Sequence, residues 1–83
     1  MKAKYGNQIV EIWKISHDTS DSEWVRAAFD KGILRWDKMN GDVLRFPQTF
    51  GGIAPVGYYL ILLNSHDYMA VTEKKFGKDF RIL

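Results

Sequence analysis

The chain has 83 residues, of which 46% are hydrophobic and 14% aromatic, and its formal net charge is +2. This composition can supply the core of one small domain spanning residues 1–83, and it excludes a disordered chain. The absence of cysteine excludes disulfides, thiolate metal sites and cysteine nucleophiles.

The distribution of apolar and charged residues also indicates the expected cellular location and the expected kinds of partner. The longest apolar run, residues 58–63, is much shorter than a membrane-spanning helix, and the first residues hold no apolar stretch of signal-peptide length. We therefore expect a cytoplasmic protein with no membrane association. Its lysines and arginines are scattered rather than gathered on one dense basic face, so we expect no nucleic-acid partner.

Residues 8–15, QIVEIWKI, predict the first strand because they are rich in β-branched and aromatic side chains. Val10 and Ile12 fall on one face of this strand, and Trp13 and Ile15 fall on the other. A strand with apolar side chains on both faces is expected inside a sheet rather than at an exposed edge.

The next segment predicts a helix. Ser20 and Glu23 have the spacing of a capping box, and Gly32 is a natural C-terminal stop. Between these positions one helical stripe is apolar, which predicts that the helix packs on the sheet; its residues are Val25, Ala28 and Phe29, with Trp24 beside them.

Residues 33–46 predict a β-hairpin whose register can be argued from the faces. A two-residue turn at Asn40 and Gly41 would mix apolar and charged side chains on both faces. A three-residue loop at residues 39–41, with Gly41 in the left-handed conformation, places Trp36 opposite Leu44 and separates the two kinds of side chain. We therefore predict the three-residue loop.

The remaining segments predict two further strands and a helical turn. Pro47 should end the second hairpin strand, and residues 51–57 predict a flexible glycine-rich corner. That corner lacks the lysine and the Ser/Thr of a phosphate-binding loop. Residues 58–63 predict a strand buried on both faces, residues 64–67 a turn, and residues 68–71 a return strand. Thr72 is expected to cap a helical turn from which Phe76 and Phe80 reach the core.

Together these elements predict an α+β fold. The expected order is β-α-β-β-β-β followed by a short C-terminal helical turn. We expect a small, bent, mostly antiparallel sheet with one helix packed on it.

Several segments also match the pattern of a known group of small proteins. They are residues 10–13 in the opening strand, 24–25 in the helix, 56–61 and 68–71 in the later strands, and the pair Phe76 and Phe80. In these segments, over nearly its full length, the chain resembles the PGDYG-like proteins of tailed phages and prophages. Tyr58 stands where that group has its Asp, and Met69 where it commonly has Pro. The resemblance implies a phage or prophage origin and a non-enzymatic accessory role, and it supplies no catalytic residue and no cofactor.

Two sets of residues are candidates for a site. His17 with Asp18 and His66 with Asp67 could form a metal site if their turns converge, but plain turn residues are the favoured interpretation, so we predict no metal. Arginines and large aromatic rings are the residues that dominate binding surfaces. We therefore predict a recognition patch from Arg35, Trp36, Arg45, Tyr58 and Tyr68.

The sequence thus favours a binding protein without catalytic residues. We expect it to block a bacterial host protein, as a host-takeover or anti-defence inhibitor does, in the host cytoplasm. The alternatives are an oligomeric sponge that sequesters a nucleotide signal with Arg35 or Arg45, and a structural phage protein. A homodimer is also open, because an apolar strand could pair across an edge.

Overall fold

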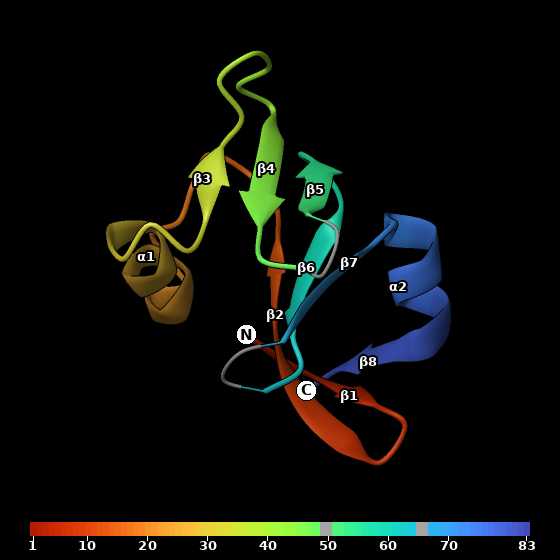
Figure 1. Cartoon of the computed structure of the whole chain (residues 1–83). Coiled ribbons are helices and arrows are strands. Elements are labelled where there is room, and N and C mark those ends of the chain that lie inside the picture. Colours follow the sequence, from red (N-terminus) through yellow and green to blue (C-terminus); the bar gives the residue numbers. More distant parts are fainter. Residues whose placement is uncertain (49–50, 65–66) are drawn as a thin grey trace.

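A computed structural model describes residues 1–48, 51–64 and 67–83. Within these residues the chain has an α+β fold of two helices and eight strands, shown in Figure 1. The elements are β1 (Lys2–Tyr5), β2 (Gln8–Lys14), α1 (Glu23–Asp30), β3 (Arg35–Trp36), β4 (Val43–Phe46), β5 (Gly52–Pro55), β6 (Tyr59–Leu62), β7 (Tyr68–Val71), α2 (Glu73–Asp79) and β8 (Phe80–Ile82).

The strands form two sheets in which every pair is antiparallel. One sheet has five strands in the order β7-β6-β2-β1-β8, and the other has three in the order β3-β4-β5. The α+β class is therefore confirmed, whereas the predicted element order omitted β1, β5 and β8. β5 and β8 are edge strands, and β1 buries only Ala3, which lies between two exposed lysines. None of these three strands therefore shows a strong apolar pattern in the sequence.

Strand β2 lies inside the five-stranded sheet, between β6 and β1, as its two apolar faces predicted. Trp13 and Ile15 lie in one core, and Val10 and Ile12 lie in the other. The sheet thus has a separate hydrophobic core on each face, and the two helices flank the sheets in Figure 1.

The first core lies between β2, β6, helix α1 and the three-stranded sheet. Helix α1 buries Val25 and Ala28 there, and Phe29 and Trp24 pack partly against it, so the predicted stripe is confirmed. The three-stranded sheet turns its inner face to this core. The buried members are Trp13, Ile15, Val25, Ala28, Leu34, Leu44, Phe46, Ala54 and Leu60.

The second core is closed by helix α2, through a ladder of four stacked rings. The ring centroids of Tyr59 and Phe76 are 3.8 Å apart, those of Phe76 and Phe80 are 5.0 Å apart, and those of Phe80 and Tyr5 are 4.5 Å apart. Phe76 and Phe80 are both buried, so the prediction that they reach the core is confirmed. The ladder ties α2 to the first strand and to the last.

The two helices begin in different ways. Thr72 caps α2 as predicted, because its Oγ1 accepts a hydrogen bond from the Lys75 N–H at 3.1 Å. The capping box predicted for Ser20 and Glu23 is wrong. The carboxylate of Asp18 binds both the N–H and the hydroxyl of Ser20, so α1 begins at Glu23 with Ser22 as an N-cap that makes no side-chain bond.

The hairpin register predicted from the faces is confirmed, since Trp36 lies opposite Leu44. The predicted left-handed conformation of Gly41 is wrong, because positive φ angles occur among the described residues only at Gly6, Gly32, Gly51 and Gly57. The loop is shaped instead by Asp37, whose carboxylate accepts hydrogen bonds from the N–H groups of Met39 and Asn40. Gly32, with a φ of 74°, ends α1 as predicted.

The glycine-rich corner is partly a strand. Gly51 and Gly57 do have positive φ, but residues 52–55 form β5, which pairs with β4 after the latter ends before Pro47. Gly52 lies directly opposite Phe46, and a Cβ atom at this glycine would lie 2.3 Å from the Phe46 ring. The glycine is therefore required by the ring that covers it rather than by flexibility.

The last predicted strands are β6 and β7. In β6, Leu60 and Ile61 are buried on opposite faces, and in β7 Val71 is buried in the second core. The predicted turn between them includes residues 65–66, which lie outside the described part of the chain. At its ends, the Asp67 N–H donates to Asn64 Oδ1 at 3.1 Å. Neither helix in the described residues has the length and the hydropathy that a bilayer crossing requires.

Candidate functional site

The outer face of the three-stranded sheet is the candidate site. Side chains alternate along β3, β4 and β5, so every second one points away from the core. The strand register places these outward side chains in rows across the sheet. We call this surface the outer sheet face; its residues are Arg35, Val43, Arg45, Ile53 and Pro55.

Two arginines lie in the same row of this face. Arg35 on β3 is directly opposite Arg45 on β4. Only Arg45 has an anionic partner, because its Nε donates to Asp37 Oδ1 at 2.6 Å. Among the described residues, no carboxylate lies within ion-pairing distance of Arg35. The face therefore presents one cation that the protein itself does not neutralise.

Asp37 organises this end of the face. Its side chain is only 16% exposed, and it accepts hydrogen bonds from Arg45 and from the main chain of Met39 and Asn40. The hydrogen bond from Arg45 is the main reason that the pKa of Asp37 lies below its ordinary value of 3.8, with smaller contributions from the two N–H groups. Asp37 is therefore ionised at neutral pH and accepts the hydrogen bond of the Arg45 Nε–H as a carboxylate.

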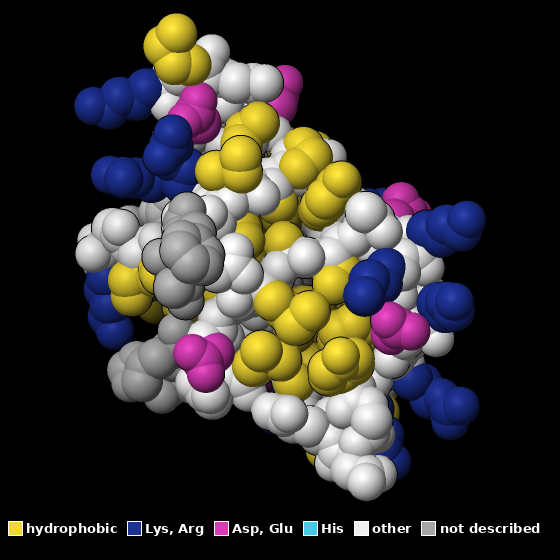
Figure 2. Space-filling model, turned by 45° about the vertical axis from the view of Figure 1, so that its right-hand side comes forward, with side chains coloured by type: hydrophobic (Ala, Val, Ile, Leu, Met, Phe, Trp, Pro, Cys, Tyr) yellow, Lys and Arg dark blue, Asp and Glu magenta, His cyan; other side chains and the backbone are white. Residues whose placement is uncertain are grey.

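Apolar side chains lie next to the arginines. Ile53, in the row of Arg45, is 65% exposed, and Val56 after β5 is 40% exposed. Met39 projects from the β3–β4 loop with 94% exposure. Figure 2 shows a band of hydrophobic side chains down the face that carries β5 and β7, with Lys and Arg side chains along both margins. A basic margin beside a contiguous apolar surface is typical of an interaction site.

Two shallow depressions flank the arginine pair. The larger, about 520 Å³, is lined by Arg35, Arg45, Ile53 and the residues around the Pro47 corner. The smaller, about 260 Å³, is lined by Arg35, Trp36, Arg45 and the base of the loop. Side chains of a partner could enter at either end of the arginine row.

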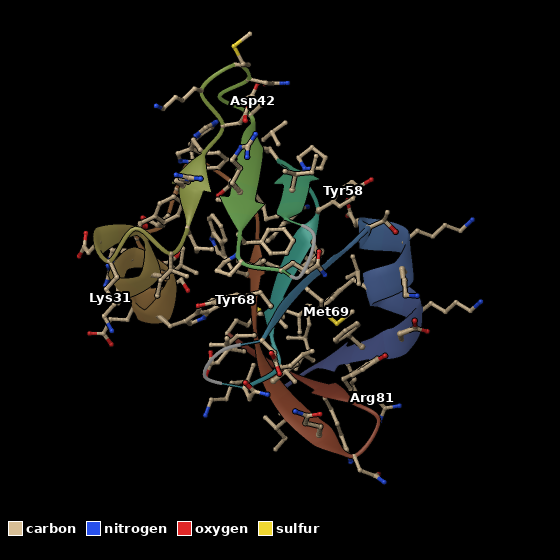
Figure 3. The ribbon with its side chains drawn as sticks, viewed as in Figure 1. Lys31, Asp42, Tyr58, Tyr68, Met69 and Arg81 are labelled. Atoms are coloured by element: carbon tan, nitrogen blue, oxygen red, sulfur yellow. The ribbon has the colours of Figure 1, made fainter. Side chains whose placement is uncertain are left out.

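The structure brings some of the predicted patch residues together and separates the others. Arg35, Trp36 and Arg45 line the smaller depression. The Trp36 ring, however, packs against the first core, and its centroid lies 4.2 Å from that of His17 with the ring planes tilted by 37°. Tyr58 and Tyr68, labelled in Figure 3, are half-buried against the first core, and neither lines the two depressions beside the arginine pair. Burial also raises the pKa of Tyr68. Neither tyrosine lies on the outer sheet face; both pack partly against the first core, and their role in binding stays a prediction.

The histidine pairs do not support a metal site in the described residues. His17 Nε2 lies 2.9 Å from Asp42 Oδ1 and links the segment before α1 to the end of the β3–β4 loop, where Asp42 directly precedes β4 (Figure 3). His66 lies outside the described residues. Within residues 1–48, 51–64 and 67–83, no three His, Asp or Glu side chains are grouped so as to hold a metal ion.

Sequence reasoning did not find the apolar half of the outer sheet face. Ile53 and Pro55 were not expected there because β5 was predicted as a corner and not as a strand. Glycine and proline both occur in edge strands, so Gly52 and Pro55 did not exclude a strand here. In the structure, residues 52–55 alternate between buried and exposed, as a strand with one buried face does. The ion pair of Asp37 with Arg45 was also not predicted.

Comparison of the chain with known proteins matched no family model, no curated protein and no solved structure. The resemblance to the PGDYG-like group therefore stays a prediction. The candidate site depends entirely on the geometry described above.

Proposed function

We propose that this protein is a non-enzymatic binding protein that docks its outer sheet face on a partner protein. The observation that carries the proposal is the unneutralised Arg35 opposite Arg45, beside the exposed Ile53. A partner that fits this face presents a carboxylate toward Arg35 and an apolar surface toward Ile53 and Pro55. Arginines and apolar anchors of this kind contribute most of the energy of protein interfaces.

A second copy of the chain is a poor match for this face. Among the residues that the structure describes, Asp37 is the only carboxylate beside the arginine pair, and Arg45 already holds it. Two copies that met face to face would therefore bring uncompensated cations together without a complementary anion. Electrostatic complementarity favours a different, acidic protein.

The resemblance described above gives the proposal a biological setting. In that setting the chain is a phage or prophage accessory protein that acts in the bacterial cytoplasm. Occupying an acidic and apolar surface of a host protein would block that surface without turnover. This mechanism requires shape and charge, which the outer sheet face offers, and it requires no reacting group.

Native mass spectrometry of the tagged protein, recovered from bacterial lysate, tests the proposal. The wild type and Arg35→Glu are compared, with Lys74→Glu on α2 as a matched control that reverses one exposed cation far from the three-stranded sheet. We expect the wild type and the control to carry the same added mass of tens of kilodaltons, and Arg35→Glu to lose it.

Other outcomes contradict the proposal in different ways. Equal retention of the partner by all three proteins would place the interface elsewhere. An added mass of a few hundred daltons would instead support the nucleotide sponge, which Arg35 and Arg45 could serve in the smaller depression. A homodimer that survives Arg35→Glu would indicate self-association through another surface.

A further inference from the structure

A second pair of opposed cations lies at the β8 edge of the five-stranded sheet. Lys4 on β1 is directly opposite Arg81 on β8. Both side chains are exposed, and neither forms an ion pair within residues 1–48, 51–64 and 67–83. Like charges in directly opposed positions destabilise a sheet, so this pair does not serve the stability of the fold.

Helix α2 brings a third cation to the same place. Lys78 lies in its last turn and, together with Lys4 and Arg81, lines a depression of about 440 Å³ where α2, β8 and the β1–β2 turn meet (Figure 1). The C-terminal end of a helix carries about half a negative charge, which a cation in the last turn offsets. This effect accounts for Lys78, but it gives no reason for the opposed pair on the two strands.

One carboxylate also lines the depression, and it already has a cationic partner. Asp79 Oδ2 lies 3.9 Å from the Nζ atom of Lys75, one helical turn earlier, and Lys75 does not line the depression. The cations that line the depression exceed this carboxylate by two charges. A ligand that neutralises the excess therefore carries about two negative charges.

The rest of the lining is small or buried. Gly6 and Gly77 line the depression, and a Cβ atom at either glycine would meet no atom within 4 Å, so a ligand has open access there. Among the described residues that line the depression, Phe80 has the only apolar side chain. Its ring is buried and stacks with the rings of Tyr5 and Phe76, so it offers no free face to a nucleobase. The depression therefore recognises charge rather than an apolar or aromatic group.

We infer that this depression binds the terminal phosphate group of a small molecule, or free phosphate. A phosphate monoester carries about 1.5–2 negative charges at pH 7, which matches the excess of cations, whereas a carboxylate or a phosphodiester carries one. The guanidinium of Arg81 donates two parallel hydrogen bonds to the phosphate, and the ammonium groups of Lys4 and Lys78 act as point charges beside it. This site lies on a different sheet from the outer sheet face.

NMR titration of the full chain tests the inference, in a phosphate-free buffer whose ionic strength is held constant so that screening does not change. The probes are inorganic phosphate and methyl phosphate, and the matched probe is dimethyl phosphate, which carries one charge. With the first two probes, we expect the amide signals of Gly6, Gly77 and Arg81 to shift and to saturate. Dimethyl phosphate should bind about three- to fivefold more weakly.

Variants of the opposed pair identify the cations that bind. Lys4→Gln and Arg81→Gln should each weaken binding of methyl phosphate by about three- to fivefold, and the double variant should show no saturation. Each change relieves the repulsion between the two strands, so the variants should fold like the wild type. Lys74→Gln removes an exposed cation of α2 that does not line the depression, and this matched control should bind like the wild type.

Four results would overturn the inference. One is the absence of saturable shifts at this depression with phosphate at about 10 mM, where a site with a millimolar dissociation constant is mostly occupied. Another is equal affinity for the monoester and the diester. A third is equal weakening by Lys74→Gln and Arg81→Gln, which would indicate diffuse attraction of anions to α2. The last is a set of shifts confined to Arg35 and Arg45, which would place the phosphate on the outer sheet face.

Discussion

Arg35 and Arg45 lie directly opposite each other on neighbouring strands, and Asp37 neutralises only Arg45. Like charges in directly opposed positions of a sheet destabilise the pair. Nothing else in the described contacts of Arg35 offsets this repulsion. The protein therefore maintains at this position a charge that does not serve its own stability, as expected for a residue that serves binding.

Replacing this arginine should change stability and binding in opposite directions. Arg35→Ala removes the repulsion and should raise the free energy of unfolding by about 0.2–1 kcal/mol at low salt, with a smaller effect at high salt. Urea denaturation at two salt concentrations measures the change. Arg45→Ala is the control, because it leaves Asp37 without its cation and should lower stability. A loss of stability in Arg35→Ala would contradict our account of the pair.

The pH dependence of the β3–β4 loop should follow Asp37. The pKa of this carboxyl is lowered from 3.8, so its stabilising effect is complete above that pH and is lost as the pH falls through the lower, folded-state value. An NMR titration of the Asp37 carboxyl carbon should give a midpoint below 3.8, together with a shift of the Arg45 Nε–H signal. Asp37→Asn should remove this part of the acid transition. A midpoint at or above 3.8 would show that the ion pair is absent in solution.

Gly52 should tolerate no side chain. Gly52→Ala places a methyl group within 2.3 Å of the buried Phe46 ring, which must move into a packed core. Overpacking of this kind costs about 1–3 kcal/mol of unfolding free energy. Thermal or chemical denaturation measures it, and Gly41→Ala is the control because a Cβ there meets no atom within 4 Å. Equal stability of the two variants would exclude the proposed role of the ring.

The two helix caps should differ in their contribution. Thr72→Ala removes the hydrogen bond from the Lys75 N–H to Oγ1 and should cost about 0.5–2 kcal/mol. Ser22→Ala removes no hydrogen bond and deletes a buried, unpaired hydroxyl, so it should leave the free energy of unfolding unchanged or raise it. Denaturation curves of both variants give the comparison. A larger loss at Ser22 than at Thr72 would mean that Ser22 has a partner within the folded chain.

The ring ladder should dominate the stability of the second core. Phe76 stacks between Tyr59 and Phe80, so Phe76→Ala opens a cavity and breaks two ring contacts. The expected loss is about 3–5 kcal/mol in unfolding free energy. Phe76→Leu should recover a large part of it by filling the volume without stacking. A loss below about 1 kcal/mol for the alanine variant would place the helix outside the cooperative core.

Elements with strong local signals were predictable from the sequence. The two-faced apolar pattern of residues 8–15 predicted an interior strand, and the pairing of Trp36 with Leu44 followed from separating apolar from charged side chains. Thr72 was recognised as a cap because its hydrogen bond is local. In each case the relevant physics acts within a short segment or across one turn.

Features that depend on distant partners were not predictable. β1 is a strand because it pairs with β2 and β8, β8 because it pairs with β1, and β5 because it pairs with β4, where Phe46 covers Gly52. Tyr58 and Tyr68 are of a residue type that is common in binding surfaces, and only the structure shows that both are half-buried against the first core. Ser20 likewise bonds to the carboxylate of Asp18 instead of capping the helix, and α1 begins later than the sequence predicted, at Glu23. Burial, rather than residue type, decides these assignments.

The pairing of β1 with β8 brings Ala3 opposite Ile82, at almost the greatest sequence separation that the chain allows. Closing so long a loop costs conformational entropy before the contacts that stabilise it can form. The pairing of β1 with β8 should therefore form late in folding. The sheet and α1 around the first core can assemble earlier from nearer neighbours. Refolding should therefore pass its rate-limiting step before the ends are joined, and variants in the ring ladder should mainly accelerate unfolding while leaving the folding rate almost unchanged.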